Sequence, residues 1–350
     1  MMTKPSPSIE YLQHPHMYLE REVAIGKRLL ILAESENGDY YNPTLVYSKE
    51  MAIDFFGGGA LVQAYEDAST YQKGLHAYLM RIEPYGYETA FAVLESFDFD
   101  LLFLKDVHFN KNNEVIHQFL EFARVKEEKG NLVHGITTLS SGLRYQDLTS
   151  LFPLIQSLTE ERGDETIERG KYLSLVVHQM EFQDAGAVYA GLLTSIEPEV
   201  SPINKTIPNV SLSFEFSKPE IHQLRSVGIV CFHQTFKKGI TCTSSSCAVS
   251  TEGSVHKHIS NFRIAQHLIN QVSNELHPLI GMPNVLHQSH NVEGIVESIC
   301  MEHIELKRIR DFGYSVGVDE LYGLIDVQIE LVPIFSVHSM TTHSRVRIFK

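Results

Sequence analysis

The sequence feature that most constrains the fold is a change of hydrophobic period in the C-terminal third. Between residues 260 and 279, apolar residues recur at steps of three and four, a spacing that places them on one buried helical face. These residues are Phe262, Ala265, Leu268, Ile269, Val272, Leu276 and Leu279. Ser260 is the predicted N-cap of this helix, and Pro278 ends it.

A second run of the same spacing predicts a second helix, which we expect Gly313 to end. Its apolar residues are Val292, Ile295, Val296, Ile299, His303, Leu306 and Ile309. The period then changes to two, which is typical of a strand with one buried and one solvated face. In this strand Ile325, Val327, Ile329 and Leu331 alternate with Asp326, Gln328 and Glu330. Pro333 limits the strand and favours an edge position.

Residues 29–200 are organised differently, because short apolar strands alternate there with helical stretches. The predicted strands are 29–33, 76–82, 99–104, 132–139 and 172–178, and the predicted helices are 48–56, 61–68, 88–95, 115–129, 148–162 and 185–194. This alternation predicts a layered α/β domain with a largely parallel sheet. The strands lack polar alternation, as expected when helices cover both faces of the sheet.

The chain thus divides into five predicted segments. Residues 1–28 contain several prolines and few apolar residues, so they form an extended N-terminal arm. The α/β domain covers 29–200, and a connecting segment with short strands covers 201–258. A C-terminal domain of two helices and a β-ribbon covers 259–340, and 341–350 form a C-terminal arm. The predicted fold class is α/β, and α+β when the whole chain is considered.

The order of these segments resembles the contractile bacteriophage tail sheath family, which includes the sheaths of related injection systems. Residues 280–284, Ile-Gly-Met-Pro-Asn, separate the two C-terminal helices as in that family. Residues 201–207, Ser-Pro-Ile-Asn-Lys-Thr-Ile, are similar to its Ala-Pro-Ala-Asn-Lys segment, and 187–193 are similar to its small-residue helix. Leu224, Gly228-Ile229 and Gly239 lie where sheath subunits carry Leu, Gly-Ile-Asn and Gly.

The resemblance implies a structural subunit without enzymatic activity or cofactor. Many copies would polymerise helically around a tail tube, and contraction of this sheath would drive the tube through the host envelope. The implied partners are further copies of the chain, the tail tube protein, and the baseplate and tail terminator proteins. The implied location is the virion tail, assembled in the host cytoplasm. The C-terminal domain would face the tube, and the α/β domain would face outward.

The C-terminal arm is basic, whereas the wet face of the preceding strand is acidic. A basic strand beside an acidic sheet edge predicts pairing, either within the chain or with a neighbour. The resemblance implies the second case, in which terminal arms link subunits by strand exchange. The predicted inter-subunit arm contains Arg345, Val346, Arg347 and Ile348. The predicted augmented strand contains Asp326, Val327, Gln328, Ile329 and Glu330.

Composition disfavours several other classes of protein. The chain has 29 Lys and Arg against 43 Asp and Glu, a formal charge of -14, and no long basic run, so we expect no nucleic-acid binding. No apolar run approaches the roughly 18 residues that span a bilayer, and 1–28 contain no signal-peptide core, so we expect no membrane insertion. The four cysteines are too few and scattered for a disulfide scaffold, which favours a reduced cytosolic origin.

One alternative is a metal site formed by Cys242, Cys247, His256 and His258, which have the ligand types of a tetrahedral zinc centre. The Cys pair is more widely spaced than in common zinc motifs, and the His-x-His pair is more closely spaced. We therefore predict no metal site and interpret the cysteines as buried or loop thiols.

A second alternative is a hydrolase that uses polar residues at the carboxyl ends of the strands, where open α/β sheets bind ligands. The residues at these ends are Asp106, His108, Thr137, Thr138 and His178. No nucleophile elbow or phosphate-binding loop accompanies them, and polar residues commonly follow strands. A third alternative is a non-contractile tail completion or baseplate component with a sheath-like domain.

Overall fold

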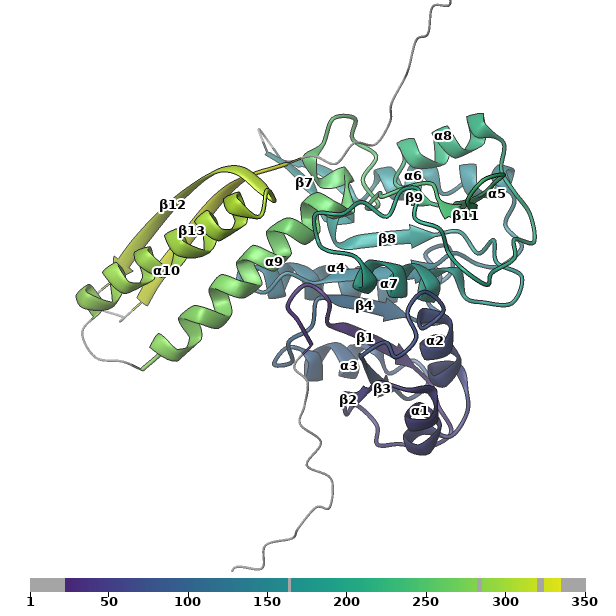
Figure 1. Ribbon diagram of the computed structural model, residues 1–350, viewed down its shortest axis with the longest axis horizontal. Coiled ribbons are helices and arrows are strands. Elements are labelled where there is room, and N and C mark those ends of the chain that lie inside the picture. The colour runs from purple at the N-terminus through teal and green to yellow at the C-terminus, as the bar shows by residue number, and fades with distance from the viewer. Residues whose placement is uncertain (1–22, 163–164, 282–284, 320–323, 335–350) are drawn as a thin grey trace, which may run out of the picture.

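The computed structural model describes residues 23–162, 165–281, 285–319 and 324–334. They form an α/β body and a lobe that projects from one side of it, which we call the ribbon lobe (Figure 1). The ribbon lobe consists of α9 (Ile259–Leu276), η3 (His277–Leu279), α10 (Val285–Glu305), β12 (Ile309–Asp319) and β13 (Leu324–Pro333). The α/β fold class with a two-helix and ribbon unit is confirmed.

The body is built on a seven-stranded sheet of order β2-β3-β1-β4-β5-β8-β9. Its strands are β1 (Leu29–Ala33), β2 (Thr44–Val46), β3 (Ala77–Arg81), β4 (Leu101–Leu104), β5 (His134–Thr138), β8 (Leu173–Val176) and β9 (Ile229–Val230). All neighbouring pairs are parallel except β2 and β3. Every residue of β1, β4, β5 and β8 is buried, which explains why these strands show no polar alternation.

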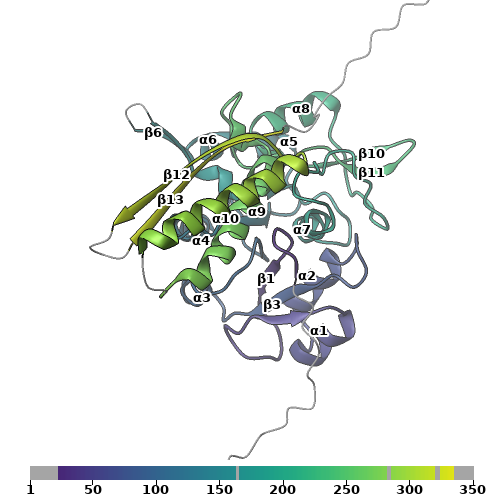
Figure 2. The ribbon, with the colours of Figure 1, turned by 60° about the vertical axis from the view of Figure 1, so that its left-hand side comes forward.

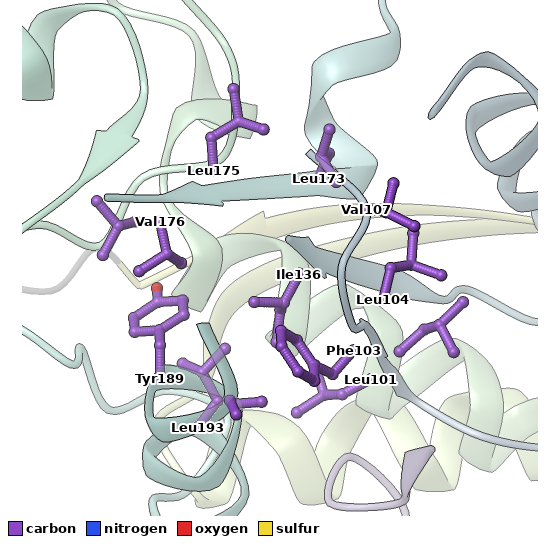
Figure 3. Packing of buried hydrophobic residues seen from close by; sticks show 14 of the residues in the cluster. Leu101, Phe103, Leu104, Val107, Ile136, Leu173, Leu175, Val176, Tyr189 and Leu193 are labelled. Atoms are coloured by element: carbon purple, nitrogen blue, oxygen red, sulfur yellow. The ribbon is translucent and has the colours of Figure 1, made fainter. Parts of the chain in front are cut away.

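Helices cover both faces of this sheet. They are α1 (Lys49–Phe56), α2 (Ala60–Ala68), α3 (Tyr87–Leu94), α4 (Asn113–Glu128), α5 (Tyr145–Thr149), α6 (Phe152–Gln156), α7 (Ala185–Ser195) and α8 (Lys218–Ser226). On β5, Gly135 faces Phe119 of α4 whereas Thr138 contacts α7, so these two helices lie on opposite faces. Figure 3 shows Tyr189 and Leu193 of α7 lying against side chains of the sheet, including Ile136 and Val176.

The predicted helix 148–162 is wrong. The structure has two short helices there, α5 and α6, followed by a hairpin of β6 (Thr159–Arg162) and β7 (Glu165–Glu168). Pro153 lies in the first turn of α6, and it has no N–H to continue a hydrogen-bond ladder from α5. The break between the helices is therefore a local effect of proline.

The segment 201–258 also contains more regular structure than predicted. Besides α8 and β9 it contains β10 (Phe232–Thr235), β11 (Gly239–Cys242) and η2 (Val255–Lys257). Outside this segment, the short helix η1 (Arg169–Tyr172) precedes β8. The α8 helix begins with a capping box, in which the backbone N–H of Ser217 donates to the Glu220 carboxylate at 2.7 Å. Pro219 lies in its first turn, where proline is favoured, so proline there marks a helix start.

In the ribbon lobe, α9 and β13 match their predictions, but two boundaries differ. Ser260 lies inside α9, and His258 holds the N-cap position. Gly313 does not end α10; it lies within β12, opposite Glu330. The chain instead leaves α10 through Lys307, whose φ of 56° is left-handed and therefore incompatible with continuing a right-handed helix.

Two hydrophobic clusters share α9. Ile259 and Phe262 belong to the core of the body, whereas Ile264, Leu268 and Val272 belong to the core of the ribbon lobe. The predicted domain boundary before residue 259 stays a prediction, since this helix contributes to both cores. Within the described residues, no helix has the length and apolarity required to cross a bilayer.

Candidate assembly surface

The β-ribbon has one packed face and one exposed face. Phe312 pairs with Leu331, Tyr314 with Ile329, and Val316 with Val327, and all of these side chains pack on the cluster formed by α9 and α10. Figure 2 shows the ribbon lying along α10. Of the predicted augmented strand, Val327 and Ile329 lie on the packed face, while Asp326, Gln328 and Glu330 are exposed.

Both outer edges of the ribbon are unpaired within the described residues, where this sheet contains only two strands. An unpaired edge presents a row of backbone N–H and C=O groups that another strand can satisfy. The register is regular from Asp311 to Asp319, so most of the edge is straight enough to accept a strand. This differs from the buried central strands of the body, whose two edges are both paired.

A largely apolar groove of about 700 Å³ lies between β13, α9 and the end of α4, where Glu127, Glu128 and Lys129 contribute charged groups to its lining. Its apolar lining is contributed by Ile269, Val272 and Leu276 of α9 and by Leu324, Ile325, Val327 and Ile329 of β13, with Val292 of α10. Ile280 and Leu324 are 76% and 58% exposed at this groove, so apolar surface there faces solvent. The groove therefore places apolar side chains next to β13, on the packed face of the ribbon.

The exposed face of the ribbon carries the carboxylates of Asp311, Asp319, Asp326 and Glu330. Arg310 lies at the irregularity near the start of β12. Carboxylates on an exposed strand keep an unpaired edge soluble, and they favour a basic strand over an acidic one as a partner.

The predicted arm residues Arg345, Val346, Arg347 and Ile348 lie outside the described residues, as do residues 1–22. Pairing between the arm and β13 therefore stays a prediction.

A buried polar network fixes α9 to the sheet. The Asp100 carboxylate, which precedes β4, accepts hydrogen bonds from the backbone N–H groups of Gly26 (2.8 Å) and Arg28 (2.9 Å). It also accepts from the Arg28 guanidinium and from Asn270 Nδ2 on α9, the latter at 2.9 Å. Gln266 Nε2 on α9 donates to the carbonyls of Asp100 (2.6 Å) and Leu132 (2.9 Å). These bonds hold the helix across the amino ends of β4 and β5.

Arg263 extends this network. Its guanidinium donates to the carbonyls of Ile196 (3.0 Å), Gly26 (3.2 Å) and Glu197 (3.4 Å), and its side chain is fully buried. Burial lowers the pKa of Arg263 to about 10. Our sequence interpretation missed this network, whose signal is a polar stripe at helical spacing, Arg263, Gln266 and Asn270, on an otherwise apolar face. The network therefore fixes residues 263–270 of α9, from which the rest of the ribbon lobe projects, to the body by buried hydrogen bonds.

The carboxyl edge of the sheet uses its polar residues in structural bonds. Thr138 donates its hydroxyl hydrogen to Asp184, which caps α7 by accepting from Gly186 N at 2.9 Å. Lys105 Nζ lies 2.8 Å from the Asp184 carboxylate, and His108 Nδ1 is 2.7 Å from the Thr138 carbonyl oxygen. Burial acts to raise the pKa of Asp184, but the Lys105 ammonium outweighs it and lowers the pKa below its usual value.

The other residues of the predicted hydrolase are not organised around a nucleophile in the described residues. Thr137 donates to the Val107 carbonyl oxygen, and Asp106 is exposed beside Lys105, with 3.3 Å between Nζ and Oδ1. Asp106 has a φ of 61°, in the left-handed region that Asp tolerates in turns. His178 is half-buried in the loop after β8. Of the residues predicted for a hydrolase, the structure brings His108 and Thr138 into contact. The Thr138 hydroxyl takes part in the cap of α7 through Asp184 and Gly186.

The predicted alternative zinc ligands lie around the loop after β11. Cys242 and Cys247 are fully buried, and Cys242 Sγ donates to the Ser244 carbonyl at 3.0 Å. Burial raises the pKa of Cys242 to about 12 and also raises that of Cys247, which favours the neutral thiol at both positions. His256 is exposed and His258 is half-buried. Within the described ranges, no three His, Cys, Asp or Glu side chains form a group that could hold a metal ion.

Neither a protein-family model nor a curated protein matches this sequence. Solved structures do match it. A chain of the anti-feeding prophage baseplate superposes with a TM-score of 0.72 at 12% identity, covering 99% of this chain and 100% of that one. A chain of the sheath complex of an extracellular contractile injection system, PVC, in the contracted state gives 0.70 at 10% identity, covering 99% and 98%. The chain has the sheath-protein fold.

The same fold occurs in a sheath tail protein solved as a crystal structure. The sheath tail protein from Listeria innocua gives a TM-score of 0.68 at 9% identity, covering 89% of this chain and 92% of that one. The likeness therefore covers the body and the ribbon lobe together. The sheath fold confirms the predicted resemblance at the level of structure, despite the low sequence identity.

Proposed function

We propose that this chain is a structural subunit of a contractile tail sheath, which polymerises helically around a tail tube and contracts to drive the tube through an envelope. The observation that carries the proposal is the sheath fold over almost the whole chain, with a contracted sheath among the similar structures. The role requires no catalytic residue and no cofactor. Its free energy would come from interfaces between subunits.

Strand exchange is the proposed link between subunits. The arm residues Arg345–Ile348 of one copy would add a strand to the β13 edge of another copy. Because side chains alternate along a strand, Val346 and Ile348 would face the apolar groove while Arg345 and Arg347 lie on the acidic face. Burying an aliphatic side chain is worth roughly 1.5–3 kcal/mol, so two such anchors per arm would add substantially to assembly.

The network around Asp100 and Arg263 supports a contraction in which subunits move as nearly rigid bodies. It ties α9 to β4 and β5 through several buried hydrogen bonds, which would resist a hinge at the base of the ribbon lobe. A sheath built of such subunits would switch between two packings of an unchanged fold. The arms would keep neighbours connected while the interfaces between bodies rearrange.

The proposed partners are further copies of the chain, a tail tube protein facing the ribbon lobe, and baseplate and tail terminator proteins at the two ends. The proposed location is a virion or injection-system tail assembled in the host cytoplasm. The acidic charge of the chain agrees with a structural role that does not include nucleic-acid binding.

A baseplate component is a second candidate, because two of the similar chains come from structures of the anti-feeding prophage baseplate. Such a component would share the fold but would form a closed ring, whereas a sheath forms an open helix.

Negative-stain electron microscopy of the purified full chain at high concentration tests these roles. Hollow tubes with a regular helical repeat are expected for a sheath subunit. Closed rings alone would favour the baseplate role, and monomers at every concentration would contradict both. Removing residues 341–350 should leave a folded monomer that no longer forms tubes, whereas tubes from the truncated chain would contradict strand exchange by the C-terminal arm.

A further inference from the structure

A polar pocket of about 540 Å³ lies away from the ribbon, between the end of α8 and the loop that leads into α9. His222, Arg225 and Ser226 of α8 line one side. The other side is lined by Ser245, Ser246, Ser250, Glu252, Lys257 and His258, with Gln156 and Val227 completing the wall. Two cations, two imidazoles and several hydroxyls thus converge in a protein whose formal charge is -14.

The pocket is lined by two cations, Arg225 and Lys257, and by one carboxylate, Glu252. The half-buried guanidinium of Arg225 forms neither a hydrogen bond nor an ion pair among the described residues. Lys257 Nζ donates to the Ser226 carbonyl oxygen at 2.6 Å, a neutral partner. Burial lowers the pKa of Lys257, Glu252 opposes this shift from an exposed position, and the positive charge of Arg225 lowers the pKa again, with a smaller opposing effect from Glu168. An anion between the two cations would relieve their repulsion.

The walls of the pocket are held in place by contacts that do not involve its cations. The backbone N–H of Cys247 donates to the Lys257 carbonyl at 2.8 Å, and Ser246 forms a β-bridge with His258. Gly228, just after α8, has a φ of 87°, and a Cβ there would lie 2.2 Å from the Cys247 carbonyl oxygen. The end of α8 is therefore packed directly on the loop, so the backbone of both pocket walls is fixed before any ligand arrives.

We propose that this pocket binds the phosphate group of a small organic molecule. The planar guanidinium of Arg225 matches two phosphate oxygens, the ammonium of Lys257 supplies a point charge, and serine hydroxyls can donate to the remaining oxygen. A volume of about 540 Å³ exceeds a bare oxyanion and lies within the range of small-molecule sites, which favours a phosphate carried on an organic group. The site is independent of the proposed sheath role.

Isothermal titration calorimetry on the full chain tests this proposal with inorganic phosphate and with a nucleoside monophosphate. We expect both to bind, the nucleotide more tightly, and we expect affinity to fall as ionic strength rises. Arg225→Gln and Lys257→Gln should each weaken binding by about tenfold or more, since each removes a charge-assisted bond. Arg225→Lys should recover little of the affinity lost in Arg225→Gln, because an ammonium lacks the planar fork that pairs with two phosphate oxygens.

Lys73→Gln is the matched control, since Lys73 is exposed in the body, forms no side-chain polar contact with the described residues, and its substitution changes the net charge equally. It should leave the affinity unchanged. Equal weakening by Lys73→Gln and Lys257→Gln would mean that only net charge matters, which would overturn the site. Absence of binding by both probes at low salt would also overturn it. Binding of inorganic phosphate with the same affinity as the nucleotide would restrict the ligand to the free anion and contradict the organic part of the proposal.

Discussion

The body and the ribbon lobe each contain a β-sheet, but the two sheets differ in how their strand edges and faces are covered. In the body, the central strands β1, β4, β5 and β8 are paired on both edges and covered on both faces. In the ribbon lobe, two strands are covered on one face, and their outer edges are unpaired within the described residues. The first sheet is stable by its own contacts, whereas the second offers backbone groups and an apolar groove to another strand.

Two aspartates give the largest expected difference between these regions. Asp100→Ala should cost about 3–5 kcal/mol in the free energy of unfolding, because it leaves Arg28 buried without its charge partner. Asp326→Ala on the exposed face of β13 should change stability by no more than about 0.5 kcal/mol. Urea unfolding of the truncated monomer, residues 1–340, measures both without interference from assembly. Equal costs would contradict the distinction between a self-sufficient sheet and an open one.

Two glycines provide a second comparison, this time of packing. A Cβ at Gly191 of α7 would lie 1.8 Å from the Ala68 carbonyl oxygen of α2, so Gly191→Ala should cost about 1–3 kcal/mol by forcing the helices apart. A Cβ at Gly294 of α10 meets nothing within 4 Å among the described residues, and Gly294→Ala should stabilise the chain by about 0.5–1 kcal/mol. Thermal unfolding of both variants shows whether each substitution raises or lowers the stability of the chain. A destabilising Gly294→Ala would show that the outer side of α10 is covered.

A pair of histidines makes the packing of α9 on α10 sensitive to pH. The rings of His267 and His303 lie 5.3 Å apart, and Arg308 is close to both. Burial, His267 and Arg308 lower the pKa of His303 to about 4. Burial also lowers the pKa of His267, which Asp100 and Glu197 raise only in part. Below pH about 6.5 the unfolded chain therefore binds more protons than the folded one.

Stability should accordingly be fully present above pH about 6.5 and fall as the pH decreases toward 4, by about 1–2 kcal/mol at pH 5 for His303. His303→Gln removes this titration while keeping a polar side chain beside Gln271. Urea unfolding at pH 7 and pH 5 should show a smaller loss for the variant than for the parent chain. An unchanged loss would assign the acid sensitivity to other groups.

The smallest effect on stability, but a clear effect on assembly, is expected from charges on the ribbon. Asp326→Lys with Glu330→Lys should leave the monomer within about 1 kcal/mol of the parent, since each cross-strand pair is worth only a few tenths to 1 kcal/mol. The same double change should raise the concentration needed for tubes. Combining it with Arg345→Glu and Arg347→Glu should restore assembly, and sedimentation of tubes measures this. Absence of rescue would mean that these charges do not face one another.

The parts of the fold that could be predicted from sequence are those with a clear hydrophobic period. The buried strands of the body and the alternating strand β13 were predicted in this way. Its partner β12 was missed because the helical pattern was extended through Ile309 as far as Gly313, although Phe312, Tyr314, Val316 and Val318 alternate with exposed residues. The helix α8 was missed because its first-turn proline was interpreted as a loop signal.

The polar elements of the candidate site were harder to predict. Asn270 and Asp100 are 170 positions apart in sequence, so no local pattern reveals their hydrogen bond. Arg263 resembles an exposed helical arginine until the carbonyls that it bonds are known. The partner of the β13 edge is proposed to belong to another copy, which a single sequence cannot place.

The most direct test of the central claim is a disulfide cross-link between differently tagged copies of the chain. One copy carries Arg347→Cys in the arm and the other carries Gln328→Cys in β13, and the native cysteines are buried, so they compete little. Oxidation of the mixed assembly should give a heterodimer containing both tags, whereas replacing Gln328→Cys by Lys73→Cys in the body should give none. Cross-linking within single copies when both cysteines are placed in one chain, without any mixed-tag heterodimer, would contradict strand exchange between subunits.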